Sequence, residues 1–290
     1  MHPACLAALR CPHCADRLHL DVQSLACANG HRFDRARQGY VNLVAGGGTP
    51  HSGDDASMVA RRERVLAAGL LDPVLAGLTE AADAALAPAP PDHDRVVVDV
   101  GAGPGVHLAG LIADDERRCG IAVDVSKHAA RRAAQAHPRI TAVVADAWTG
   151  LPVADGAADL VVVVFAPRDG AELARVLAPH GQLLVVVPSD DHLANLRERL
   201  GLLAVAAGKD EHISTQLAPQ LELLDLRTIS WERSLTRTQA LDLVGMGPSA
   251  HHVDLDAVAS KLAGDDEPLT MRGSVQLLAF THASSAADTP

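Results

Sequence analysis

Four side chains near the N-terminus have the types and the spacing of a zinc site. Two residues separate Cys11 from Cys14, twelve more precede Cys27, and three separate Cys27 from His31. The short first spacing lets one tight turn direct both sulfur atoms at a single ion, and the second pair closes a tetrahedron around it. Because four protein ligands leave no position for water, the pattern predicts one structural Zn²⁺ ion per chain, holding a segment too small to bury its own core.

The remaining cysteines, Cys5 and Cys119, fall outside this pattern, and we expect both to be buried free thiols. Burial as free thiols is also the alternative for Cys11, Cys14 and Cys27, but it explains their spacing poorly.

The chain does not start with a charged segment followed by a long apolar core, and its longest apolar run, Leu160 to Ala166, is too short to cross a bilayer. We therefore expect a cytoplasmic protein without disulfides or membrane contact.

A glycine-rich loop forms the second chemical feature. An apolar run ending at Val100 leads into Gly101-Ala102-Gly103-Pro104-Gly105, and such glycines let the backbone pass close to a bound ligand. The dinucleotide fingerprint requires glycine or alanine at position 106, where this chain has Val106. The loop therefore predicts a nucleotide-type cofactor other than a dinucleotide.

The G-x-G-x-G spacing, with Asp99 two residues before it, resembles motif I of class I S-adenosylmethionine-dependent methyltransferases. In that class the loop lies beneath the methionine and ribose of the cofactor. Asp124 ends the next apolar run, where a carboxylate can accept the ribose hydroxyls, and Asp146 ends the third, near the adenine. Either acid alone could be a helix cap or a surface residue. Their succession favours the cofactor interpretation.

These residues need a parallel sheet to bring them together. From residue 95 short apolar runs alternate with helical segments, which predicts an α/β fold, Rossmann-like and of class I methyltransferase type, with a small N-terminal zinc-binding module. We expect strands at residues 95–100, 118–123, 140–145, 160–165, 182–187, 221–230 and 272–281, and short ones at 18–22 and 32–33. We expect helices at residues 56–68, 106–113, 127–137, 169–177, 191–203, 236–244 and 254–262.

Glycine-rich and proline-rich stretches at residues 45–50 and 86–94 suggest two joints. The expected parts are a zinc-binding RNA-recognition module (1–45), a linker and helical connector (46–94) and the methyltransferase domain (95–290).

Phe165 and Pro167 follow the fourth predicted strand, where this fold binds the methyl acceptor. Phe165 could stack on a planar base, or it could be an ordinary aromatic anchor of a turn. No side chain stands out as the proton acceptor, so the catalytic residues stay unassigned. His192 also lies beyond a strand end, where an isolated histidine is more often a bystander.

The net charge of −11 argues against a polyanionic partner, but residues 1–70 contain eight arginines and six acidic residues. An RNA contact should therefore begin at the N-terminal end. The candidates are the arginines at positions 32, 35, 37, 61, 62 and 64, which could equally form a solvated face.

Taken together, the chain resembles the 23S ribosomal RNA (guanine-N1)-methyltransferases of the RlmA family, including the branch found in macrolide-producing actinomycetes. The matching segments are Cys11-Pro12-His13-Cys14, Cys27, His31-Arg32-Phe33-Asp34, Gly39-Tyr40-Val41-Asn42-Leu43, Gly53-Asp54, Arg61-Arg62, Asp99 to Gly105, Asp124-Val125-Ser126-Lys127, Phe165-Ala166-Pro167 and Asp191-His192-Leu193.

The resemblance implies that S-adenosylmethionine methylates a guanine N1 in a domain II hairpin loop of 23S ribosomal RNA, that the zinc module recognises this hairpin, and that the protein is a homodimer. In the producer branch the modification protects against tylosin-like macrolides. It also implies cofactor contacts at Leu71, at His192 and in the loop Pro104, Gly105, Val106 and His107. Leu71 replaces an aromatic residue of some relatives and Pro104 replaces an acid, so cofactor packing should differ here.

Two alternatives remain at this stage. The acidic main domain is compatible with a small-molecule methyltransferase in which the zinc module is a lid. A zinc-ribbon adaptor that kept the cofactor fold for protein binding is the other.

Overall fold

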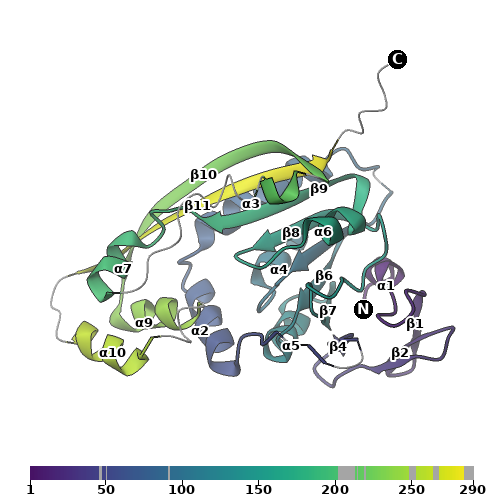
Figure 1. Ribbon diagram of the computed structural model, residues 1–290, viewed down its shortest axis with the longest axis horizontal. Coiled ribbons are helices and arrows are strands. Elements are labelled where there is room, and N and C mark those ends of the chain that lie inside the picture. Colours follow the sequence, from purple (N-terminus) through teal and green to yellow (C-terminus); the bar gives the residue numbers. More distant parts are fainter. Residues whose placement is uncertain are drawn as a thin grey trace, which may run out of the picture.

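The computed structural model describes residues 1–45, 48–49, 51–90, 92–201, 213, 215–218, 220–247, 253–263 and 268–283. Its main feature is an eight-stranded sheet with the order β10-β11-β9-β8-β5-β6-β7-β4 (Figure 1). The strands are β4 (Val41–Asn42), β5 (Arg95–Val100), β6 (Arg118–Asp124), β7 (Ile140–Val144), β8 (Ala158–Val164), β9 (Leu177–Pro188), β10 (Leu221–Leu235) and β11 (Leu269–His282). Strands β4 to β9 pair in parallel, and β11 pairs antiparallel to both β9 and β10.

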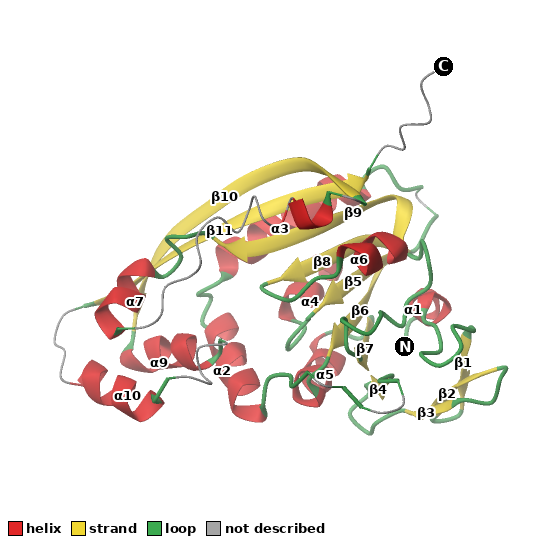
Figure 2. Ribbon diagram, in the orientation of Figure 1, coloured by secondary structure: helices red, strands yellow, loops and turns green. Residues whose placement is uncertain are grey.

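Helices cover both faces of this sheet, as Figure 2 shows in red. The described helices are α1 (Pro3–Ala8), α2 (Ala56–Ala67), α3 (Asp72–Leu86), α4 (Val106–Ala113), α5 (Lys127–Ala136), α6 (Gly170–Val176), α7 (Ala194–Leu200), α9 (Arg237–Gly245) and α10 (Leu255–Ala263). Of these, α2 and α10 pack mainly on α9 rather than on the sheet. The predicted α/β fold class is thereby confirmed.

Side chains alternate between two buried cores because neighbouring strand residues point to opposite faces. Val97 and Val162 pack with α3 and α4 on one face, whereas Val98 and Val161 pack with α1 and α6 on the other. All four are fully buried, as expected for strands of a parallel sheet covered on both sides.

The first 45 residues are joined to the main sheet. Strands β1 (Leu18–Asp21), β2 (Ser24–Cys27) and β3 (Arg32–Asp34) form a separate antiparallel sheet. After them β4 pairs with β7, and the N–H of Leu43 donates to the carbonyl of Val144 at 2.8 Å. The Sγ of Cys5, in α1, lies 3.4 Å from the carbonyl oxygen of Gly120. The domain division at residue 45 stays a prediction.

Most predicted elements lie within a few residues of the observed ones, and the differences have local causes. Helix α3 was not expected, because its alanine-rich sequence gives a weak apolar stripe. Strand β2 was missed because its four residues are all buried and show no alternation, and β4 because it has only two residues. Helix α7 is shorter than predicted over the described residues, and positions 202 and 203 of that prediction lie outside them. Residues 46, 47 and 50 of the first predicted joint and residue 91 of the second also lie outside the described residues.

Among the described helices, none alone is long and apolar enough to span a membrane. Helices α2 and α3 reach that length only as a pair, across a bend of 79°.

Candidate methyl-transfer and zinc sites

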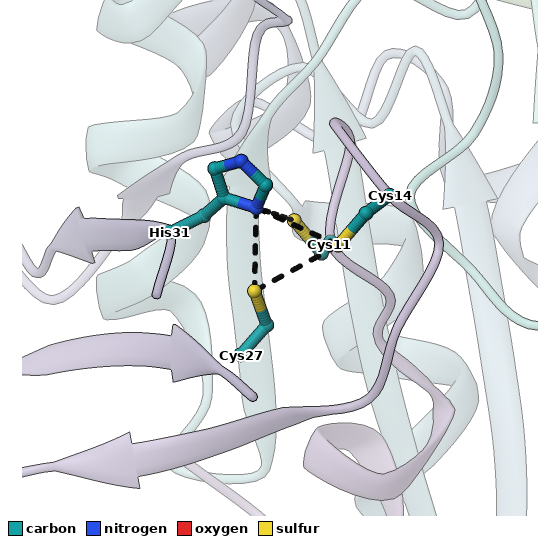
Figure 3. Close-up of side chains that lie close together, drawn as sticks. All are labelled: Cys11, Cys14, Cys27 and His31. Atoms are coloured by element: carbon teal, nitrogen blue, oxygen red, sulfur yellow. Dashed lines mark hydrogen bonds between the residues drawn. The ribbon is translucent and has the colours of Figure 1, made fainter. Parts of the chain in front are cut away.

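The four predicted zinc ligands converge on one point, as the close-up in Figure 3 shows. The Nδ1 of His31 lies 3.5 Å from the Sγ of Cys11, 3.5 Å from that of Cys14 and 3.3 Å from that of Cys27. The Sγ atoms of Cys14 and Cys27 are 3.8 Å apart. A tetrahedral zinc site with ordinary bond lengths has sulfur–sulfur edges of about 3.8 Å and sulfur–nitrogen edges of about 3.5 Å. The donor set therefore fits a zinc ion.

Two tight turns position these ligands. In the first, the N–H of Ala15 donates to the carbonyl of Cys11 at 2.8 Å, and Ala15 has a φ of 57°. In the second, the N–H of Gly30 donates to the carbonyl of Cys27 at 3.0 Å. The Asn29 amide donates to the sulfur of Cys14 at 3.4 Å. This bond, followed by one from the backbone of Asp16, lowers the pKa of the Cys14 thiol to about 6, which favours the thiolate that a metal requires.

The second site is a cavity of about 1310 Å³ at the carboxyl ends of β5 to β9. The chain runs from β5 through β6 and β7 to one side and then crosses back to β8 on the other side of β5, and parallel sheets bind ligands at such a reversal point. The predicted residues that line it are Leu71, Asp99, Gly101, Gly103, Pro104, Val106, His107, Asp124, Asp146, Phe165, Pro167 and His192.

Gly105 is the predicted cofactor residue that does not line the cavity. Its φ is +77°, and a Cβ there would lie 2.9 Å from the Cα of Ala133 in α5. Gly105 therefore allows α4 and α5 to pack closely. Gly101 is constrained in the same way, because its Cβ would lie 2.3 Å from that of Ala166.

Backbone hydrogen bonds hold the carboxylate of Asp124 at the cavity wall. Its Oδ2 accepts from the N–H of Gly103 and its Oδ1 from that of Ser126, each at 2.8 Å. Burial raises the pKa of Asp124 although both of these bonds lower it. A ligand hydroxyl or cation at this carboxylate would offset the cost of burying it.

Asp99 is a second buried acid of the cavity. Its side chain is buried, and its Oδ1 has no hydrogen-bond partner in the part of the chain that the structure describes. Burial, followed by the charge of Asp124, raises the pKa of Asp99 to about 7. Burial and then the charge of Arg62 lower the pKa of His107 to about 4, so this imidazole is neutral. An ammonium group fits the unpaired oxygen of Asp99.

The carboxylate of Asp146 is engaged by the segment that follows the zinc module. Its Oδ2 accepts from the hydroxyl of Thr49 and lies 2.8 Å from the Nδ1 of His51, and its Oδ1 accepts from the N–H of Trp148 at 3.0 Å. Burial alone would raise the pKa of Asp146, but these bonds outweigh it and hold the pKa below its ordinary value. Asp146 is therefore ionised at neutral pH.

Aromatic side chains mark the other half of the cavity, beyond β8 and β9. Phe165 is 41% exposed and has a φ of 55°, a conformation uncommon outside glycine. Its ring centroid lies 6.0 Å from that of His192, which in turn lies 6.3 Å from that of Trp231. The Nδ1 of His192 lies 2.9 Å from the carbonyl oxygen of Ser274, which fixes the ring. A flat group can enter beside Phe165.

Comparisons with known proteins agree with these two sites. Residues 9–45 match the model of the N-terminal zinc ribbon of RlmA, and residues 97–181 match a methyltransferase domain model. The chain is 45% identical to a protein of Micromonospora griseorubida described as a candidate 23S rRNA (guanine-N(1)-)-methyltransferase, over 97% of this chain and 99% of that protein. The 23S rRNA (guanine(748)-N(1))-methyltransferase of Streptomyces fradiae is 44% identical, over 88% of this chain and 90% of that protein.

The chain belongs to the family of 23S rRNA (guanine-N1)-methyltransferases. The resemblance drawn from the sequence is thereby confirmed. Among solved structures, YcgJ from Bacillus subtilis has a TM-score of 0.50 at 16% identity, over 73% of this chain and 98% of that chain. That likeness supports the fold alone.

The structure gives Arg61, Arg62 and Arg64 an internal role in this family member. Arg61 and Arg64 both bind the buried carboxylate of Asp242 in α9, at 2.9 Å and 2.6 Å. Arg62 pairs with Asp54 and donates to the carbonyl of Met246 at 2.7 Å. These arginines tie α2 to α9 and to the cavity wall, so the structure does not support them as phosphate contacts. Arg32, Arg35 and Arg37 of the zinc module remain exposed.

Several cavity residues lie outside every motif used in the sequence analysis. They are His51, Trp148, Arg168 and Arg197. Trp148 carried a usable signal, because it follows the predicted adenine-site acid by two residues. The others come from loops and a helix whose position depends on long-range packing.

Proposed function

We propose that this protein transfers a methyl group from S-adenosylmethionine to N1 of a guanine in 23S ribosomal RNA. One observation carries the proposal, beside the near full-length family match: a single cavity brings Asp99 and Asp124 together with Phe165. Its volume of about 1310 Å³ exceeds the roughly 300–1,000 Å³ of an ordinary ligand pocket. It has room for a cofactor and for a base that enters beside it.

The chain's own residues fit the cofactor. The ionised carboxylate of Asp99 would hold the ammonium of the methionine part, and that of Asp124 would accept the ribose hydroxyls. Asp146 and Trp148 would border the adenine, and the walls between are Leu71, Gly101, Gly103, Pro104, Val106, His107 and His192. When bound, the cofactor supplies an already activated methyl group.

The protein must therefore align the two reactants and exclude water, rather than activate the methyl donor. Phe165 would stack on the guanine and hold its plane toward the cofactor half of the cavity, with Pro167 stiffening the loop. Guanine N1 carries a proton at neutral pH, and this proton has to leave as the N–CH₃ bond forms. The acceptor of that proton is left unassigned.

The zinc ion would act through the shape of residues 1–45. Its four ligands hold the turns of this module, which lies at the end of the molecule opposite α9 and α10 (Figure 1). Arg32, Arg35 and Arg37 of the module are exposed, and Arg32 forms an ion pair with Asp21. We propose, from the family resemblance, that this module recognises a domain II hairpin, that the protein is a homodimer, and that methylation protects against tylosin-like macrolides. Light scattering on the purified protein and macrolide susceptibility of a host with and without the gene test the last two points.

Transfer of radioactivity from tritiated S-adenosylmethionine to undermethylated 23S ribosomal RNA tests the main proposal. Labelled RNA is expected. Label in a small polyketide or sugar acceptor and none in RNA would favour a small-molecule methyltransferase, and the absence of both transfer and cofactor binding would favour a zinc-ribbon adaptor.

A further inference from the structure

Two arginines lie in the acceptor half of the cavity without a carboxylate partner among the described residues. Arg168 and Arg197 both line the cavity. The Nη1 of Arg168 donates to the carbonyl of Ala166 at 3.3 Å, and the Nη2 of Arg197 donates to that of Asp190 at 2.9 Å. Neither forms an ion pair with a carboxylate in the described ranges.

Both guanidinium groups also carry buried nitrogens that bind nothing in those ranges. These are the Nε of Arg168 and the Nε and Nη1 of Arg197. A buried N–H without an acceptor is costly, and more so when it belongs to a charged group. Arg95 and Arg118 also carry a buried Nε without a hydrogen bond, but their guanidinium groups form ion pairs with Asp115 and Asp83, whereas those of Arg168 and Arg197 form none within the described ranges. Burial lowers the pKa of Arg168, a penalty that a bound anion would relieve.

The fold places these two cations on the acceptor side of the cavity. The cofactor acids Asp124 and Asp146 follow β6 and β7, on one side of β5. Arg168 follows β8, and Arg197 lies in α7 after β9, on the other side of β5 together with Phe165. The cofactor loop already has its own cation, because a Cβ on Gly103 would lie 3.5 Å from the Nη1 of Arg62.

We propose that Arg168 and Arg197 bind the backbone phosphates on either side of the target guanosine when its base turns in beside Phe165. The inference rests on the proposed function, because a nucleotide within RNA carries a phosphate on both its 5′ and its 3′ side. Guanidinium groups donate two parallel hydrogen bonds to phosphate oxygens, which fixes position as well as charge. The pair would thus select a nucleotide within a strand over a free base or nucleoside.

The experiment uses the full-length zinc-loaded protein and the variants Arg168→Ala, Arg197→Ala and the double substitution. Arg117→Ala is the matched control, since Arg117 pairs loosely with exposed acids at the opposite end of the strands. The readouts are the KM for undermethylated 23S ribosomal RNA, filter binding of that RNA as a function of salt, and the Kd of S-adenosylmethionine without RNA.

Each alanine variant is expected to raise the KM for RNA about tenfold, and to make the slope of log affinity against log salt shallower by about 1. The Kd of S-adenosylmethionine and the behaviour of Arg117→Ala should stay within about twofold of wild type. Arg168→Lys and Arg197→Lys keep the charge and should retain most of the salt slope even if an alanine variant folds poorly.

Three results would overturn the inference. A matching loss of S-adenosylmethionine affinity without RNA would assign the arginines to the cofactor carboxylate. RNA binding and salt slopes no different from those of Arg117→Ala would make them structural. If the wild-type protein itself methylates no RNA, the proposed function fails and this inference fails with it, whereas a failure confined to the variants leaves the proposed function intact.

Discussion

The backbone N–H of Gly103 donates to the Oδ2 of Asp124 at 2.8 Å, so the glycine loop after β5 and the carboxylate at the end of β6 hold each other in place. The N–H of Ser126 binds the other oxygen at the same distance. A cofactor that spans the ends of β5 and β6 therefore meets a carboxylate whose orientation is already set.

Asp124→Asn should weaken the binding of S-adenosylmethionine about 10- to 100-fold, as expected for the loss of a charged hydrogen-bond acceptor. An amide keeps one acceptor oxygen, so one of the two backbone bonds should also be lost. Calorimetric titration measures the affinity. Asp92→Asn is the control, because the Asp92 side chain is 97% exposed. Equal affinities for the two variants would contradict the role given to Asp124.

Asp99 should make the stability of the cofactor-free protein depend on pH. Its folded pKa of about 7 lies above the ordinary value of 3.8, so the folded state binds the extra proton and stability is lost as the pH rises from about 4 through 7. Asp124 shifts in the same direction. Asp99→Asn should flatten the fall in melting temperature between pH 5 and pH 8. An unchanged pH profile in this variant would show that Asp99 is not buried as described.

The same carboxyl group should give cofactor affinity the opposite pH dependence. Ionised Asp99 attracts an ammonium group, so the affinity for S-adenosylmethionine should rise as the pH approaches 7. Asp99→Asn should bind weakly at every pH in that range. Titrations between about pH 5.5 and pH 7, where the ammonium of the ligand keeps its proton, compare the two proteins, and a wild-type affinity that falls over this range would refute the assignment.

Removal of zinc should disrupt the module at residues 1–45 and abolish RNA binding, because metal binding supplies most of the folding free energy of such a small zinc module. Cys27→Ser should lose the one zinc ion per chain measured by atomic absorption. Cys119→Ala, a buried cysteine outside the ligand set, should keep it. RNA binding that survives metal loss would separate the zinc module from recognition.

Phe165→Ala should lower the rate of methyl transfer to RNA about tenfold or more, since stacking of a base on an aromatic ring contributes about 1–3 kcal/mol. Phe165→Trp should retain most of the activity, and S-adenosylmethionine affinity should not change. Leu224→Ala is the control, because Leu224 is 51% exposed on β10 and does not line the cavity. Full activity of Phe165→Ala would mean that the ring is only an anchor of its turn.

The sequence predicted those features whose signal is local. The zinc ligands occur within 21 residues, and the glycine loop is a continuous run after an apolar strand, so spacing alone indicates their chemistry. Strands β5 to β9 could be predicted equally well, because each contains a short apolar run. The pairing of β4 with β7 could not be predicted from the sequence, because two residues are too few to show the alternation of a strand and their partners lie about a hundred positions later.

The same reason explains the surprises within the site. Composition marks Arg61 and Arg64 as free positive charge, but both bind the one carboxylate of Asp242, some 180 residues later. The same composition does not distinguish Arg168 and Arg197, whose buried guanidinium nitrogens find no acceptor among the described residues, a feature visible only once the strand ends are assembled. Charge counts locate arginines, and packing decides which of them are available to a ligand.

The most direct test of the proposed function maps the modified nucleotide. Undermethylated 23S ribosomal RNA is incubated with the protein and S-adenosylmethionine, copied by reverse transcriptase, and digested for mass spectrometry. We expect a new termination site next to one guanine in a domain II hairpin loop, because an N1 methyl group blocks base pairing, together with one added methyl group on that guanine. Methylation confined to another atom or base, or no change in the RNA while the cofactor binds normally, would contradict the account.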